Sequence, residues 1–265
     1  MMVTCICGND LPLHPGGGRQ KHYCSDRCRQ QAKRDRDNPK RDVSPILNQI
    51  ITGDSRDLAK DIPDSSIDLV FCDPPYLREN IDAGIYAWLA REACRVLKPG
   101  GFCLANCGTY WLSHAIGQMS QHLTFFWEYR ILFRGGAGIH YERRTRPGST
   151  PVLAFTKGKS RGQNPPYRLV LDVYQGSGAD KSFHKWGQDA YSVQYYLDCL
   201  SRPGDVIWDP FTGGGTVPYV CKTLGRNFIA FEIDAATADI ARRRLEIVQP
   251  RLMPESMIQA GLEIA

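Results

Sequence analysis

The chain has 265 residues, of which 42% are hydrophobic, and a formal net charge of +5. Its length and apolar content suit one α/β domain with a small appendage. No apolar run reaches the roughly 18–20 residues of a membrane span, and the first residues lack the features of a signal peptide. These properties argue against a membrane protein and predict a cytoplasmic one.

The excess positive charge lies at the N-terminal end of the chain. Residues 1–41 contain nine Lys and Arg and four Asp and Glu, whereas the remaining basic and acidic residues cancel. A basic end on a neutral body predicts a module that binds a polyanion, although a solvated basic tail has the same composition.

Four cysteines near the start predict a structural zinc site. A cytosolic chain with ten cysteines favours metal sites or free thiols over disulfides, and a segment this short has too little core to fold alone. Residues 1–37 resemble small treble-clef zinc fingers, which end in Tyr-Cys-Ser-x-x-Cys-Arg as residues 23–29 do. The first cysteine pair is one residue closer than in those fingers, so His14 and His22 remain alternatives to the first ligand. The expected tetrahedral zinc ligands are Cys5, Cys7, Cys24 and Cys28.

A basic helix and a linker follow the cysteines. Residues 38–45 contain two prolines and predict a linker. The basic side chains before it share much of one helical face and suit contacts with DNA phosphates. They are Arg29, Lys33, Arg34 and Arg36.

The next segment predicts two strands that end in acids. The apolar run 46–51 ends at Thr52-Gly53-Asp54, and residues 56–62 predict a short helix. The buried strand 67–71 then leads into Asp73-Pro74-Pro75-Tyr76. Proline cannot continue a sheet ladder, so Asp73 is expected at the carboxyl end of a strand, where open α/β sheets bind ligands.

The middle of the chain predicts further alternating elements. Residues 77–83 are polar and predict a connection. We expect helices over 85–97 and 110–119, a strand over 102–105, and an antiparallel pair over 125–133 and 151–155 that closes the sheet. Residues 168–173 predict a further strand. The connection 134–148 is long, glycine-rich and basic. It suits phosphate and base contacts, and equally a mobile solvated loop. Its candidate DNA-binding residues are Arg143, Arg144 and Arg146.

The C-terminal part predicts a strand, a glycine-rich turn, a helix and a second strand. Asp205–Trp208 precedes Asp209-Pro210-Phe211-Thr212-Gly213-Gly214-Gly215-Thr216, then come a helix to Leu224 and a strand that ends in Glu232. Glycines allow backbone to approach a ligand, and an acid after the second strand can take both hydroxyls of a ribose. A nucleoside ligand is therefore expected. Helices over 192–200 and 235–248 flank this unit.

The two motifs together resemble the permuted (β) class of amino DNA methyltransferases that use S-adenosylmethionine. The resemblance spans about residues 50–248, with Asp-Pro-Pro-Tyr first and Phe-x-Gly-x-Gly second. It implies an α/β Rossmann-like methyltransferase sheet with helices on both faces over 46–250. It also implies a small target-recognition element within 157–183, before a tail over 251–265.

The resemblance also implies roles for individual residues. The catalytic segment is Asp73, Pro74, Pro75 and Tyr76. The cofactor-binding residues are Asp54, His184, Gln188, Asp209, Pro210, Phe211, Thr212, Gly213, Gly215, Thr216 and Glu232.

The expected reaction is methylation of a flipped adenine at N6 in duplex DNA. Asp at the first motif position is commoner in adenine enzymes of this family, and cytosine-N4 methylation is the alternative. An RNA or protein methyltransferase and a non-catalytic nucleic-acid-binding subunit are weaker alternatives. Double-stranded DNA is the expected partner, and a homodimer remains open because dimers are frequent in this class.

Overall fold

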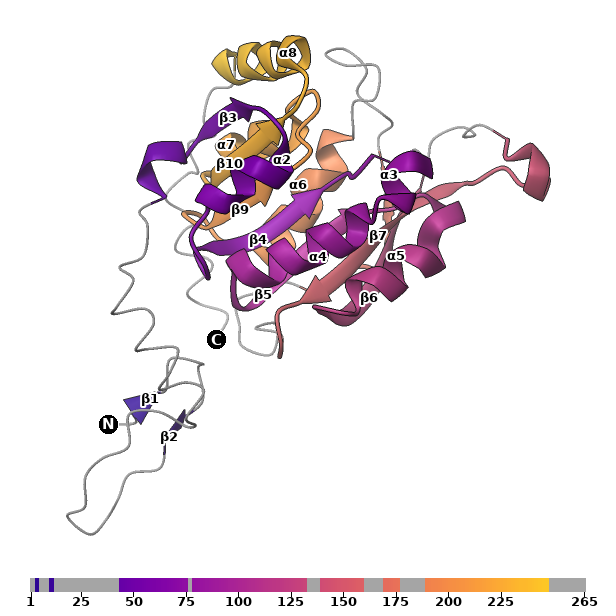
Figure 1. The fold of residues 1–265 in the computed structure, drawn as a ribbon, viewed down its shortest axis with the longest axis horizontal. Coiled ribbons are helices and arrows are strands. Elements are labelled where there is room, and N and C mark those ends of the chain that lie inside the picture. The colour runs from indigo at the N-terminus through magenta and orange to yellow at the C-terminus, as the bar shows by residue number, and fades with distance from the viewer. Residues whose placement is uncertain are drawn as a thin grey trace.

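The computed structural model describes residues 43–75, 78–132, 139–159, 169–176 and 189–247, together with the backbone of two short N-terminal strands. Those strands, β1 (Val3–Thr4) and β2 (Asp10–Leu11), pair antiparallel with each other. The rest of the described chain forms an α/β fold around one eight-stranded sheet (Figure 1).

The sheet has the order β3-β10-β9-β4-β5-β7-β6-β8. The first five strands are parallel, β7 runs antiparallel to both of its neighbours, and β8 lies parallel to β6 at the edge. The predicted antiparallel pair is therefore confirmed as β6 and β7. The strands are β3 (Gln49–Thr52), β4 (Ile67–Cys72), β5 (Leu97–Asn106), β6 (Thr124–Leu132), β7 (Ser149–Thr156), β8 (Val173–Gln175), β9 (Val206–Asp209) and β10 (Asn227–Glu232).

Helices cover both faces of the sheet, as predicted. One face packs against α4 and α5, and the other against α6, α7 and α8. Within the described ranges, no helix combines the length and the apolar character needed to cross a bilayer. The α-helices are α2 (Ser55–Leu58), α3 (Arg78–Asp82), α4 (Ile85–Val96), α5 (Leu112–Met119), α6 (Ala190–Leu200), α7 (Thr216–Leu224) and α8 (Ala235–Glu246), and the 3-10 helices are η1 (Ser44–Ile46), η2 (Ala59–Asp61), η3 (Thr109–Trp111) and η4 (Tyr141–Arg143).

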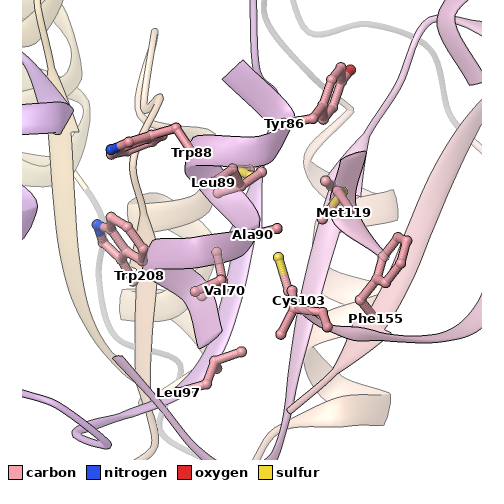
Figure 2. Close-up of a cluster of buried hydrophobic side chains, with 14 of the residues drawn as sticks. Val70, Tyr86, Trp88, Leu89, Ala90, Leu97, Cys103, Met119, Phe155 and Trp208 are labelled. Carbon is pink, nitrogen blue, oxygen red and sulfur yellow. The ribbon is translucent and has the colours of Figure 1, made fainter. Parts of the chain in front are cut away.

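Strand β4 is central because both of its faces are buried. Successive side chains of a strand point to opposite faces. Val70 packs with Leu89 and Trp208 under α4 (Figure 2), whereas Leu69 and Phe71 join the cluster under α6, α7 and α8. This burial on both faces explains why β4 reads as a continuous apolar run, and it fixes the point where the strand ends.

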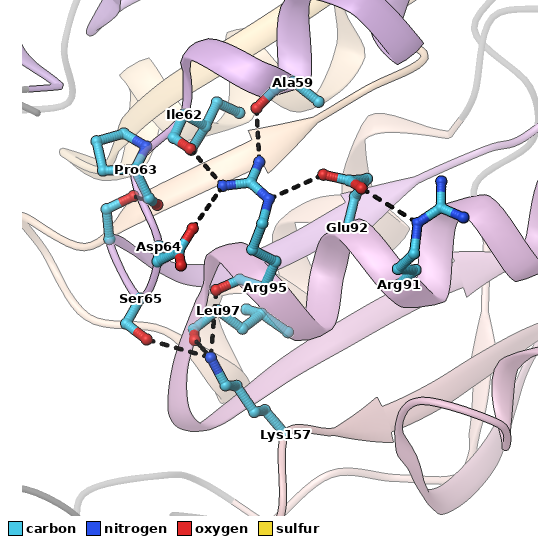
Figure 3. Close-up of polar contacts among 11 residues, drawn as sticks. Ala59, Ile62, Pro63, Asp64, Ser65, Arg91, Glu92, Arg95, Leu97 and Lys157 are labelled. Atoms are coloured by element: carbon cyan, nitrogen blue, oxygen red, sulfur yellow. Dashed lines mark hydrogen bonds and ion pairs between the residues drawn. The ribbon is translucent and has the colours of Figure 1, made fainter. Parts of the chain in front are cut away.

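The C-terminal end of α4 is held by two basic side chains (Figure 3). Arg95 pairs with Glu92 and Asp64 and donates to the carbonyls of Ile62 and Ala59. Lys157 donates to the Leu97 carbonyl at 2.6 Å, and burial lowers its pKa. Lys157 thus satisfies carbonyls at the end of α4, and Arg95 joins this end of the helix to η2 and the residues that precede β4.

Short elements differ from the sequence predictions. Residues 78–82 form α3, where only a polar connection was expected, and β3 begins at Gln49 after η1. Strand β5 begins at Leu97 instead of residue 102. The strand expected over 168–173 is found at Val173–Gln175, because pairing with β6 decides its position.

Candidate active site

The candidate site lies where three neighbouring strands end. Strand β9 pairs in parallel with β4 on one side and with β10 on the other, so their carboxyl ends share one edge. Asp73 follows β4, Asp209 ends β9 and Glu232 ends β10. The chain leaves β4 toward α4 on one face and leaves β9 toward α7 on the other. This edge is therefore the topological switch point, where open α/β sheets bind ligands.

The Asp-Pro-Pro segment continues directly from β4. Asp73 is half-buried, Pro74 is buried and Pro75 is exposed, while Tyr76 lies outside the described residues. Cys72 lies opposite Ala105 in the parallel pair of β4 and β5, so Asp73 follows beside Asn106. The prolines end the strand and fix the backbone of the segment.

The glycine-rich turn after β9 is held by its own hydrogen bonds. The Asp209 carboxylate accepts the Phe211 N–H at 3.1 Å, and the Thr212 N–H donates to the Phe231 carbonyl at 2.9 Å. The Ser55 hydroxyl of α2 donates to the Pro210 carbonyl. Hydrogen bonds within the protein thus fix the turn to β10 and α2.

Glycine is required where the turn meets α8. Gly215 has a φ of +79°, and a Cβ placed on it would lie 2.9 Å from the Ala241 Cβ. The buried Arg244 of α8 donates to the Gly214 carbonyl at 3.2 Å and to the Thr216 hydroxyl at 3.0 Å. Helix α8 therefore supports the turn from behind. No described atom lies within 4 Å of a Cβ placed on Gly213, which leaves the other side of the turn open.

Glu232 connects the turn to the end of β10. One carboxylate oxygen accepts the Gly213 N–H at 2.8 Å, and the other accepts the Asp234 N–H at 2.9 Å. Asp54 lies close by, because the Gly53 N–H donates to the Glu232 carbonyl at 2.9 Å. The Asp54 side chain caps α2 by accepting the Arg56 N–H at 2.8 Å. Each carboxylate retains lone pairs for a ligand hydroxyl or amine.

Aromatic side chains support Phe211 within the turn. The half-buried Phe211 ring packs edge-on against Trp88 of α4, with ring centroids 5.9 Å apart. Trp88 in turn packs against Trp208 at 6.3 Å, and Figure 2 shows these two indoles side by side. The turn and the helix after Asp73 are therefore joined by direct contact.

Burial and neighbouring acids dominate the electrostatics of the site. The pKa of Asp209 is raised to about 8, mainly because the group is buried. Hydrogen bonds from the Phe211 N–H and the Thr212 side chain oppose this shift, and the charges of Glu232 and Asp73 add to it. Three acids thus share a small region, in which Asp73 and Glu232 favour a positively charged ligand while the Asp209 carboxyl group is mostly protonated at neutral pH.

The structure adds polar residues that the sequence did not single out. Among the described residues, the buried Asn106 Oδ1 has no hydrogen-bond partner, and the buried Tyr86 hydroxyl lies beside the Cys107 thiol. Burial raises the pKa of Tyr86, the neighbouring Cys107 adds to this shift, and the Asp73 charge contributes less. Neither Asn106 nor Tyr86 stands out in the sequence, because an Asn after a strand and a Tyr in an amphipathic helix are both common. Arg244 was missed for a similar reason, since an arginine in a polar helix is normally solvated.

Several predicted residues cannot be placed against this site. His184 and Gln188 lie outside the described residues, as do the basic side chains Arg29, Lys33, Arg34 and Arg36 and the zinc ligands Cys5, Cys7, Cys24 and Cys28. Arg143, Arg144 and Arg146 are described and exposed, on the connection between β6 and β7. In the described ranges, no group of three or more His, Cys, Asp or Glu side chains could hold a metal ion.

Comparison with known proteins agrees with this geometry. Residues 190–243 match a family model described as DNA methylase, of the N6/N4 class. The chain is 28% identical to the Type II methyltransferase M.HinfI of Haemophilus influenzae, over 85% of this chain and 75% of that protein. It is 26% identical to M.HpaI of Haemophilus parainfluenzae, over 71% and 70% of the two chains.

Solved structures show the same fold at lower identity. The complex of M1.HpyAVI with S-adenosylmethionine has a TM-score of 0.61 at 22% identity, over 75% of this chain and 99% of that one. The cytosine-N4-specific PvuII DNA methyltransferase has a TM-score of 0.62 at 17% identity, over 80% and 90%. The fold is therefore that of the methyltransferases, and the similarities support an amino-DNA methyltransferase.

Proposed function

We propose that this protein is a DNA methyltransferase that transfers a methyl group from S-adenosylmethionine to the N6 amine of adenine in duplex DNA. One observation carries the proposal: the Asp73-Pro74-Pro75 segment and the turn from Asp209 to Thr216 follow adjacent parallel strands. A methyl acceptor held by the Asp-Pro-Pro segment and a nucleoside cofactor held by the glycine-rich turn would meet at the carboxyl ends of these strands.

The described residues suit the cofactor. S-adenosylmethionine supplies an electrophilic methyl group on a sulfonium cation. The acids Asp73 and Glu232 complement a positive charge, and the side of the turn at Gly213 is open. In this proposal Glu232 accepts the ribose hydroxyls and Asp54 lies on the adenine side. His184 and Gln188 complete the proposed cofactor set from outside the described residues.

The Asp-Pro-Pro segment activates the amine in this proposal. The lone pair of an exocyclic amine is delocalised into its ring, and hydrogen bonds accepted from its N–H groups localise that pair on nitrogen. The Asp73 carboxylate and the Pro74 carbonyl would accept them. As the nitrogen–carbon bond forms, the carbon–sulfur bond breaks, and the nitrogen then releases a proton. Tyr76 would stack on the flipped base.

Asp73 also supports adenine as the target. In the resembling family an Asp at this position is commoner in adenine enzymes, and Ser or Thr in cytosine-N4 enzymes. The likeness to the cytosine-N4-specific PvuII enzyme keeps cytosine as the second candidate. Duplex DNA is the proposed partner, and the bacterial relatives make the cytoplasm the proposed location.

Methyl transfer from labelled S-adenosylmethionine tests this function. Unmodified duplex DNA, RNA and protein would be offered in parallel, and the DNA digested to nucleosides for mass spectrometry. We expect N6-methyladenine from the wild type and a loss of roughly 100- to 1,000-fold in rate for Asp73→Ala, because one preorganised acceptor is removed.

A matched variant separates this effect from a general loss of charge. Asp57→Ala removes an exposed carboxylate from α2 that pairs only with the exposed Lys60 among the described residues, and it should retain the wild-type rate. N4-methylcytosine as the product would move the target to cytosine. Label only in RNA or protein, or equal rates for both variants, would refute the proposed function.

A further inference from the structure

The connection between β6 and β7 carries a closed turn. His140 and Thr145 form an antiparallel bridge, with the His140 N–H donating to the Thr145 carbonyl at 2.9 Å. Inside it, the Thr145 hydroxyl donates to the Arg143 carbonyl at 2.8 Å, and Arg144 adopts a φ of +50°. Residues 139–146, named the arginine turn below, thus form a hydrogen-bonded turn whose side chains are exposed.

Tyr110 of η3 anchors this turn to the body of the protein. Its ring stacks on His140, with centroids 6.3 Å apart and an interplanar angle of 20°. The Arg143 guanidinium carbon lies 5.2 Å from the centre of the same ring. Tyr110 also packs edge-on against Trp111 at 4.9 Å. A tyrosine that follows β5 therefore fixes the direction of a turn about thirty residues later in the chain, through stacking and a cation–π contact.

The arginine turn exposes a combination of groups that suits nucleic acid. The side chains from Ile139 to Arg146 are exposed, and Tyr141 retains 82% of its surface. The turn carries three arginines and one glutamate. Figure 1 shows η4 projecting away from the sheet, beyond α5. An exposed flat ring surrounded by guanidinium groups complements a polyanion whose bases offer flat apolar faces.

The arginine turn lies at the same end of the sheet as Asp73, the end where β4 and β5 terminate. Strands β4 and β5 are parallel, so Asp73 and Asn106 end on the same side. The Cys107 N–H donates to the Pro151 carbonyl at 3.0 Å, which puts the start of β7 at that side too. A DNA strand that places its base at Asp73 would therefore pass close to the turn.

We propose that Tyr141 stacks on a nucleobase beside the extruded target, while Arg143, Arg144 and Arg146 contact the flanking phosphates. In this proposal Tyr110 is a positioning residue that holds the turn toward the DNA. The inference rests on the proposed function and deepens it, because it assigns the contact that stabilises the distorted duplex.

Fluorescence anisotropy with a fluorescein-labelled, mixed-sequence duplex tests this without requiring catalysis. Tyr141→Ala should weaken binding roughly 5- to 150-fold, as expected for the loss of one base stack, whereas Tyr141→Phe should bind like the wild type. Tyr110→Ala should weaken binding and lower its salt dependence, because the released turn no longer holds its arginines at the phosphates. Arg143→Gln should reduce the slope of log affinity against log salt by about one.

Controls keep the outcome interpretable. Trp127→Ala removes an exposed aromatic ring from the half of β6 that lies away from this edge, and it should bind DNA like the wild type. Affinity for S-adenosylmethionine should be unchanged in all variants, which shows that they fold. Equal affinity of Tyr141→Ala and wild type for the duplex would overturn the inference. DNA binding that follows these expectations without any methyl transfer would refute the proposed function and leave the turn as a binding element.

Discussion

The Asp209 carboxyl group is buried at the end of β9, with only 2% of its surface exposed. Its pKa is raised from an ordinary 3.8 to about 8, so at neutral pH the unliganded protein keeps it mostly protonated. A neutral carboxyl group still accepts the Phe211 N–H and shapes the turn. Deprotonation adds a negative charge beside Asp73 and Glu232, which a bound cation would stabilise.

Cofactor affinity should therefore depend on pH through Asp209. We expect S-adenosylmethionine to bind more tightly as the pH rises from about 6 to 9, because the ionised carboxylate attracts the sulfonium cation. Asp209→Asn should bind more weakly at high pH and lack this part of the dependence. Isothermal titration calorimetry of both proteins measures the affinity at each pH. Protonation of the cofactor itself affects both proteins equally and cancels in the comparison. Parallel curves for the two proteins would contradict the assignment.

The same group predicts the pH dependence of stability. The folded pKa of Asp209 lies above the unfolded value, so the folded state binds more protons between pH 3.8 and about 8. Its contribution is fully present below this window and is lost as the pH rises through it. Asp209→Asn should consequently unfold at a higher temperature than the wild type above pH 8, in thermal scans without cofactor. An equal difference at pH 5, early in this window, and at pH 9, above it, would exclude this explanation.

At this scale the sequence predicts strand-end acids well and supporting residues poorly. Asp73, Asp209 and Glu232 each follow a short apolar run, so their positions come from a local pattern. Arg244 becomes a support of the turn only because α8 approaches Gly215, a contact between segments that fold onto each other. The role of such a residue depends on tertiary packing that no local pattern records.

At the scale of elements, the turn and α8 form one packed unit. Gly215→Ala should destabilise the protein by about 2–4 kcal/mol, because alanine is strained at positive φ and its Cβ would meet Ala241. Gly225→Ala is the matched control. Gly225 also has a positive φ, +69°, but no described atom lies within 4 Å of its added Cβ. It should therefore cost only about 1–2 kcal/mol. Urea unfolding of both variants measures the difference, and equal losses would show that α8 does not restrict the turn.

Elements with strong periodicity are predicted more accurately than short ones. The helix expected over 85–97 is found at Ile85–Val96, since its apolar stripe faces the sheet along its whole length. The buried strand before Asp73 is found within one residue for the same reason. The short α3 and β8 were missed or displaced, because a single turn or three residues carry no periodic signal and depend on their neighbours.

At the scale of the whole molecule, the fold brings together segments far apart in the sequence. Asp73 lies in the first third of the chain and the glycine-rich turn in the last third, yet β4 and β9 are neighbours. The sequence predicts this meeting only through the family resemblance, because strand order is a property of tertiary pairing. Apart from the backbone of β1 and β2, the basic N-terminal module lies outside the described residues, so its zinc ligands and DNA contacts remain predictions.

The N-terminal module can be tested through its metal in the whole 265-residue chain. We expect about one equivalent of zinc per purified chain, because four thiolates satisfy its tetrahedral preference. Cys28→Ser should lose the metal and, since the basic helix following the site is no longer held, bind duplex DNA more weakly with a smaller salt dependence. Cys94→Ser is the matched control, as it changes a half-buried free thiol of α4 and should keep both zinc and affinity.

Elemental analysis and anisotropy measure the two properties, and S-adenosylmethionine affinity should stay constant because the sheet carries that site. A zinc-free wild type, or loss of zinc without any change in DNA binding, would separate the cysteines from DNA recognition and leave the arginine turn as the main contact.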